Sequence, residues 1–182
     1  FATHIMKRPR GLNDPIPVGC YWRAAIVLFF KYGLDTGCIW KSKPVHEPIL
    51  WRHISWERQS PDRQIKQQSR WGWLYYRRVK TGKAFHRPIN RVVHAHIKSL
   101  LPKDPSPDEP VFRGGTARPN ALFHILCGIA GIEPKTNPET DIREPWKLKD
   151  LRKTCATYHD EHVPESSIEI LGHSLSGITY RH

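Results

Sequence analysis

The sequence lacks features that would place the chain in a membrane or in an oxidising compartment. Its longest apolar run, Ala24 to Phe30, is far shorter than the roughly 20 residues that a membrane-spanning helix needs. Phe1 to Arg10 is no secretory signal, because its basic residues follow a weak apolar stretch instead of preceding it. The four cysteines form no C-x-x-C pair, which indicates reduced thiols in a signal-less chain. We therefore expect a cytoplasmic protein without a membrane partner.

A metal-binding pattern is lacking as well. Among the eleven histidines, neither His94/His96 nor His159/His162 has a matching second pair of ligands at zinc-finger spacing. His94 and His96 would also lie on different faces of a helix. We expect scattered histidines, with no metal and no other cofactor.

Acidic residues are scarce relative to basic ones. The chain has 29 Lys and Arg against 17 Asp and Glu, which gives a formal charge of +12 and a pI near 9.8. Such a surplus is typical of proteins that bind a polyanion, either nucleic acid or an anionic membrane surface. The alternative is a soluble protein that is merely basic. With 38% hydrophobic and 25% charged residues, the composition is that of a globular domain with a sizeable core.

Residues 1–14 are polar and basic, and we expect them to form an arm or tail ahead of one domain that spans residues 15–182. Residues 21–34 are apolar nearly all round, as in a buried helix, and Gly33 suits the end of that helix.

Three short segments with strand character follow. They are residues 49–55, the aromatic-rich residues 70–80, and residues 83–89. Thr81-Gly82 is a suitable hairpin turn between the last two segments. The aromatic residues of this hairpin are expected in the core, and its basic residues are expected to contact phosphates.

The rest of the chain is expected to be helical, with loops between the helices. Asn90 would cap the first of these helices. The expected helices span residues 91–101, 117–130, 148–161 and 165–171. Together with the small sheet they give an α+β fold, mostly helical, with an inserted three-stranded antiparallel sheet.

Three motifs occur in order near the end of the chain. They are KDLRKT at residues 149–154, LGHS at residues 171–174, and TYRH at residues 179–182. Each alone is common in proteins. In this order and spacing they resemble the catalytic domain of tyrosine recombinases, the phage-integrase type, whose pattern is H-x-L-R-H-T, then L-G-H-S, then a tyrosine. Residues 79–89 also resemble the lysine-bearing hairpin of that family.

The resemblance implies a metal-free reaction on double-stranded DNA. Arg152 would hold the scissile phosphate with a bidentate fork, and His173 would donate to a non-bridging oxygen or handle the proton of the nucleophile. Lys80 would protonate the leaving 5′ oxygen. Tyr180 would form a covalent 3′-phosphotyrosine, which conserves the bond energy for rejoining. Lys149 takes the place of the first histidine of the motif and keeps a cation near the phosphate.

Further basic residues are expected to contact the DNA backbone. Lys83, Arg77 and Arg87 belong to the proposed hairpin, and Lys153 lies near a helix start that already favours phosphate. Contacts of this kind predict binding that weakens steeply with salt.

The sequence departs from the family pattern at two places. The first arginine of the family normally follows G-L, but here the motif is Gly33-Leu34-Asp35, and a carboxylate would repel the phosphate. Either the site is impaired, or another arginine such as Arg52 replaces it, or the alignment is shifted there.

The nucleophile is the second departure. It usually lies about nine residues after the histidine of L-G-H, a slot that falls on His182. It is therefore Tyr180, a residue beyond His182, or absent, and we expect the domain to be incomplete at its C-terminal end.

Three functions remain open from the sequence. The first is a recombinase or integrase that cleaves and rejoins DNA, and the second is a degenerate relative that binds DNA without cleaving it. The third is a basic nucleic-acid-binding helical module whose motif match is accidental. The family acts as tetramers on DNA, although this chain could be monomeric.

Overall fold

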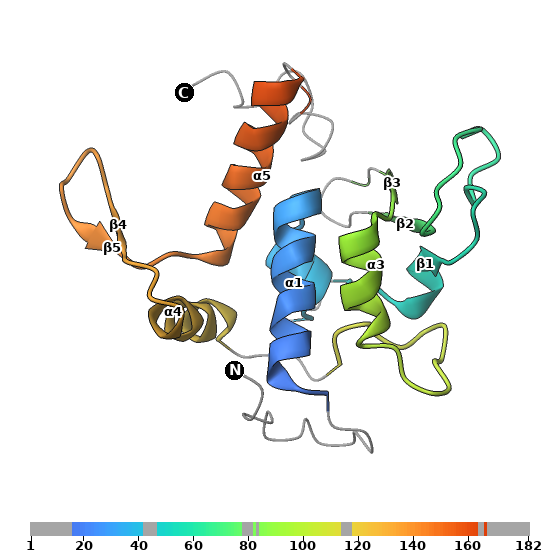
Figure 1. Cartoon of the computed structure of the whole chain (residues 1–182), viewed down its shortest axis with the longest axis horizontal. Helices are drawn as coiled ribbons and strands as arrows, with labels where there is room; N and C mark the ends of the chain where they lie inside the picture. The colour runs from blue at the N-terminus through green and yellow to red at the C-terminus, as the bar shows by residue number, and fades with distance from the viewer. Residues whose placement is uncertain are drawn as a thin grey trace.

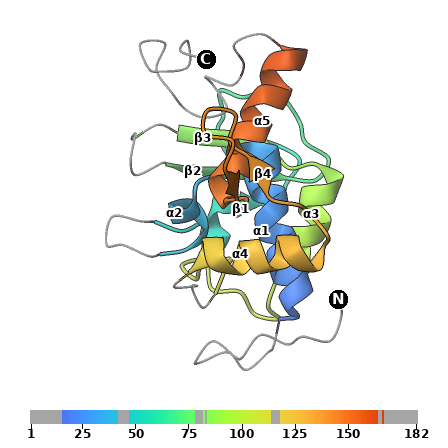
Figure 2. The same cartoon turned by 90° about the vertical axis from the view of Figure 1, so that its left-hand side faces the viewer.

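The structure is a computed structural model that describes residues 16–41, 47–77, 82, 84–113, 118–163 and 166 (Figures 1 and 2). Its elements follow one another in the order α1 (Val18–Tyr32), α2 (Thr36–Ile39), the short 3-10 helix η1 (Trp51–His53), β1 (Ile54–Ser55), β2 (Trp73–Arg77), β3 (Ala84–Pro88), α3 (Arg91–Lys98), α4 (Pro119–Ile129), β4 (Lys135–Thr136), β5 (Arg143–Glu144) and α5 (Leu148–His162).

The α+β fold expected from the sequence is confirmed. Strands β1, β2 and β3 form an antiparallel sheet in that order, and β4 pairs with β5 in a separate two-stranded ribbon. In the sheet Ile54 lies opposite Leu74, and Tyr75 lies opposite His86. The expected arm, residues 1–14, lies outside the described residues.

Helix α1 is the centre of the molecule, with α3 on one side and α5 on the other (Figure 1). Its buried residues come from several sides of the helix, as expected from its nearly continuous apolar sequence: Tyr21, Trp22, Ala24, Ala25, Leu28, Phe29 and Tyr32. The helix ends at Gly33, whose φ of 55° allows its N–H to donate to the Phe29 carbonyl at 3.0 Å. The turn directs the next residues, Leu34 and Asp35, toward α5.

The aromatic residues of β2 are divided between two covered faces. Tyr76 packs on Phe85 and donates to the Cys38 thiol at 3.3 Å, on the side of α1 and α2. Trp73 is buried on the other face, where its indole N–H donates to the Arg58 carbonyl at 3.0 Å. The prediction that these aromatics belong to the core is confirmed for Trp73 and Tyr76. The polar loop from residue 57 to 69 covers the second face. Both faces of β2 are therefore shielded from solvent, which explains why polar and apolar residues do not alternate along this strand.

The first predicted strand, residues 49–55, is wrong over most of its length. Only Ile54 and Ser55 pair with β2. The preceding residues turn in η1, since the N–H groups of Trp51 and Arg52 donate to carbonyls of Glu109 and Pro107 in the proline-rich loop. A partner so distant in sequence cannot be read from the local pattern.

Other elements were not predicted. The short helix α2 begins where the Asp35 carboxylate accepts the Cys38 N–H at 3.1 Å. Strands β4 and β5 occupy part of a segment expected to be an unpaired loop. The predicted helix over residues 165–171 lies almost entirely outside the described residues. Within the part of the chain that the structure describes, no helix combines the length and apolarity needed to cross a bilayer.

Candidate nucleic-acid interface

Helix α5 carries the KDLRKT motif and is held at its first turn by a buried carboxylate. Asp150 is 5% exposed, and its two oxygens accept the Lys147 N–H and the Lys135 ammonium, each at 2.8 Å. Burial alone would raise the pKa of this carboxyl, but hydrogen bonds and charge from Lys135 and the Lys147 N–H outweigh it and lower the pKa. The first turn of α5 is thus tied to β4 by an ionised pair.

Arg152 lies two residues after Asp150 on α5, facing the segment that follows α1. Its guanidinium Nη1 is 3.5 Å from Oδ2 of Asp35, with the two side chains 21% and 45% exposed. The other carboxylate oxygen of Asp35 caps α2 through the Cys38 N–H. Asp35 therefore caps the N-terminus of α2 and also forms an ion pair with the arginine of the KDLRKT motif.

This ion pair joins two motifs that are far apart in the sequence. The resemblance assigned Asp35 to the slot of the first family arginine and Arg152 to the slot of the second, both beside one phosphate. The two slots are neighbours in the structure. An anion that approached Arg152 would also meet the Asp35 carboxylate beside it, and the two negative charges would repel each other.

Of the remaining predicted site residues, four lie in the described part of the chain and four lie outside it. Lys149 and Lys153 are exposed on α5. Arg77 is exposed at the end of β2 and donates to the Gly82 carbonyl at 2.7 Å, and Arg87 is half-buried on β3. The other predicted residues lie outside the described residues: Lys80, Lys83, His173 and Tyr180.

Arg52, the alternative for the missing first arginine, is engaged elsewhere. Its guanidinium forms an ion pair with Asp108 in the proline-rich loop. Arg152 forms an ion pair with Asp35, the residue in the slot that the resemblance gives to the missing arginine.

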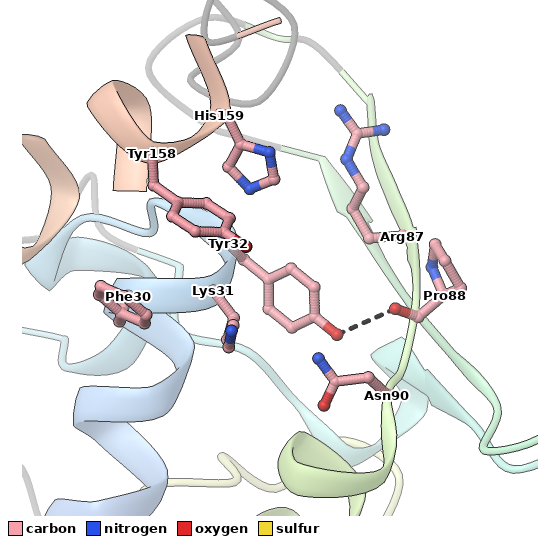
Figure 3. A pocket seen from close by; sticks show the side chains of 8 residues that line it. All are labelled: Phe30, Lys31, Tyr32, Arg87, Pro88, Asn90, Tyr158 and His159. Atoms are coloured by element: carbon pink, nitrogen blue, oxygen red, sulfur yellow. Dashed lines mark hydrogen bonds between the residues drawn. The ribbon is translucent and has the colours of Figure 1, made fainter. Parts of the chain in front are cut away.

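A pocket of about 340 Å³ opens between the end of α1, strand β3 and the second half of α5 (Figure 3). Eight described residues line it: Phe30, Lys31, Tyr32, Arg87, Pro88, Asn90, Tyr158 and His159. The Tyr32 hydroxyl donates to the Pro88 carbonyl at 2.9 Å and ties the helix end to the strand. In Figure 3, Arg87 and His159 lie on opposite sides of the opening, above the ring of Tyr32.

The polar side chains of this pocket are mainly hydrogen-bond donors. The Asn90 carbonyl oxygen already accepts the Val93 N–H at 2.9 Å, so its amide nitrogen is the group left toward the pocket (Figure 3). The Lys31 ammonium lies 5.3 Å from the Phe30 ring centre and 5.9 Å from that of Tyr158. None of the eight lining residues is acidic.

The charge of the pocket is reflected in His159. Burial lowers the pKa of this imidazole, and the neighbouring charges of Lys31, Arg87 and His162 lower it further, against a smaller opposite effect of Asp160. The imidazole is thus surrounded by more positive than negative charge.

Of the pocket residues, sequence reasoning selected only Arg87 as a functional residue. His159 is two helical turns from Arg152, which puts both side chains on one face of α5 about 10 Å apart along the axis. That helical spacing was a usable signal for His159. The local pattern marked Asn90 only as the N-cap of α3, and it gave no role to Lys31, which lines the pocket through the packing of α1.

Among the residues that the structure describes, no group of three or more His, Cys, Asp or Glu side chains is placed to hold a metal ion. Comparison with known protein families, with curated proteins and with solved structures gives no match.

Proposed function

We propose that this chain is the catalytic domain of a tyrosine-recombinase-type protein that acts on double-stranded DNA. The observation that carries the proposal is the contact between Asp35 and Arg152. An accidental match of short motifs gives no reason for the GLD segment after α1 and the LRKT segment of α5 to meet. A shared phosphate site gives that reason.

The basic residues of α5 suit this proposal. Among the basic side chains of the motif, Arg152 is half-buried and ion-paired, which suits a bidentate phosphate ligand. Lys149 and Lys153 are exposed on the same helix and would neutralise neighbouring phosphates. In this proposal Lys80 is the general acid, His173 assists at the phosphate, and a tyrosine, Tyr180 or a later one, is the nucleophile.

A second candidate is a relative that binds DNA and does not cleave it. It is favoured by the same ion pair, because a carboxylate 3.5 Å from Arg152 replaces a phosphate-binding cation with a group that repels phosphate. Loss of one electrostatic donor at a reacting centre typically reduces the rate by about 10²–10³.

The deciding experiment offers a nicked suicide DNA substrate to the 182-residue chain and to a version that continues beyond His182. A covalent protein–DNA adduct is expected for a cleaving enzyme. Arg152→Ala should then reduce the rate of adduct formation by about 10²–10³ while retaining most of the salt-sensitive binding.

Lys103→Ala is the matched control, because Lys103 lies in the exposed loop after α3. Duplex binding without any adduct selects the second candidate. Failure of the chain to bind duplex DNA at low salt rules out both.

A further inference from the structure

The pocket between α1, β3 and α5 is separate from the Asp35–Arg152 pair, but His159 and Arg152 lie on the same face of α5. Lys31 comes from α1, Arg87 from β3 and His159 from α5, so three elements each contribute a basic side chain. Such convergence is a property of the tertiary structure and not of a charge run along one surface helix.

We propose that this pocket binds one phosphate group of the DNA backbone, beside the phosphate held at Arg152. The inference rests on the proposed function for the source of that phosphate. The volume of about 340 Å³ lies in the range of small-ligand sites and admits a phosphate with part of its sugar. The Lys31 ammonium, the Arg87 guanidinium and the Asn90 amide supply donors, which are the groups that phosphate oxygens require.

The aromatic walls fit the same occupant. Tyr32 is buried and fixed by its bond to the Pro88 carbonyl, so the floor of the pocket keeps its shape. Tyr158 is 45% exposed at the rim, where its ring can cover the apolar side of a sugar. A low-dielectric wall behind the cations strengthens their attraction for an anion.

His159 provides a direct measurement of occupancy. The charged groups that face it are Lys31 from α1, Arg87 from β3, and His162 and Asp160 from α5 itself. A phosphate dianion or diester in the pocket adds negative charge next to the imidazole, so the pKa of His159 should rise when the pocket fills. The rise can be followed by NMR of the imidazole, assigned with His159→Gln.

The first arm uses inorganic phosphate against chloride at equal ionic strength, on the 182-residue chain without DNA. Phosphate is expected to raise the pKa of His159, and Lys31→Gln or Arg87→Gln should abolish this response. The same two variants should already raise the pKa of His159 in chloride, because each removes a neighbouring cation. Because loss of burial would raise this pKa as well, an unchanged urea denaturation curve is the control that shows that the variants keep the pocket folded.

The second arm measures duplex binding as a function of salt. Lys31→Gln and Arg87→Gln should each weaken binding equally for unrelated sequences and reduce the slope of log K against log salt by about 1. Lys103→Gln, in the loop after α3 at the opposite end of α1 from the pocket, should leave the slope unchanged (Figure 1).

The outcomes separate the inference from the proposed function. If phosphate raises the pKa of His159 but the salt slope is unchanged in the variants, the pocket binds free phosphate and the DNA-backbone assignment is overturned. If neither phosphate nor duplex affects His159, the phosphate site itself is overturned. If the chain fails to bind DNA, the proposed function fails, and the first arm still tests the pocket.

Discussion

Two basic regions lie along one face of α5, and they differ in what surrounds their cations. Near the start of the helix, Arg152 meets the Asp35 carboxylate at 3.5 Å. Near its end, His159 shares a pocket with Lys31 and Arg87, and none of the eight described lining residues is acidic. A phosphate that approaches the first region must compete with a carboxylate, whereas the lining of the second offers mainly donors. The difference shows that the net charge of +12 does not by itself say where an anion binds.

The largest expected effect concerns Asp150, which fixes the first turn of the helix that carries both regions. Asp150→Ala should reduce the free energy of unfolding by about 3–5 kcal/mol, because it leaves the half-buried Lys135 ammonium and the Lys147 N–H without their carboxylate. Urea denaturation measures the loss. Lys149→Ala, at the exposed neighbouring position, should change stability by less than about 0.5 kcal/mol. A loss below 1 kcal/mol for Asp150→Ala would show that α5 is held mainly by its apolar face.

The contribution of Asp150 to the free energy of unfolding depends on pH with a definite sign. The pKa of Asp150 is lower in the folded chain than in the unfolded one, so its contribution is present above its unfolded pKa and is lost as the pH falls through the folded value. Unfolding of the wild type should therefore become easier in acid below about pH 4. The Asp150→Asn variant should lose this part of the acid dependence. An unchanged pH profile for Asp150→Asn would contradict the assignment.

The next largest expected effect is on DNA affinity, when the carboxylate beside Arg152 is removed. Asp35→Asn keeps an N-cap residue on α2 but removes the charge beside Arg152. An exposed ion pair contributes up to about 1 kcal/mol, and repulsion of a phosphate at about 4 Å adds a similar amount. We therefore expect duplex DNA to bind about three- to tenfold more tightly in a fluorescence anisotropy titration.

The matched control for Asp35→Asn is Asp108→Asn. This change also removes a carboxylate from an arginine, Arg52, in a different part of the molecule. It should change DNA affinity far less than Asp35→Asn. Equal effects of the two variants would mean that only net charge matters, and the contact of Asp35 with Arg152 would then have no special role in binding.

The smallest expected effect concerns pH at the pocket. Because burial and nearby cations lower the pKa of His159, the imidazole is mostly neutral at pH 7, and a bound phosphate should favour its protonation. DNA affinity at fixed ionic strength should then rise as the pH falls from about 7 toward 5, by about two- to threefold. His159→Gln should flatten that dependence, while Asp35→Asn should keep it. If His159→Gln has the same pH profile as the wild type, protonation of His159 does not contribute to DNA binding.

The pocket could be found only in part from the sequence. Arg87 was selected because it belongs to the hairpin motif, and His159 could have been selected from its helical spacing to Arg152. Lys31 could not, because its position beside α5 depends on how α1 ends at Gly33 and packs. Residue type and local period contain no information about that packing.

The predicted strand over residues 49–55 failed for a related reason. Its β-branched and aromatic residues favour a strand, yet Trp51 and Arg52 donate to the loop at residues 107–109 and turn in η1. Local propensity is a weak preference of under about 1 kcal/mol per residue, so a distant hydrogen-bond partner can override it.

The sequence by itself determined the α+β class, the buried helix α1, the β2–β3 hairpin and the helix that carries Arg152. These follow from apolar periodicity, turn residues and caps, which act over a few residues. Only the tertiary structure decided that Asp35 meets Arg152 and that Lys31, Arg87 and His159 surround one pocket. The physical reason is that electrostatic contacts depend on distances between elements, and those distances are set by the packing of α1 against α5 and the sheet.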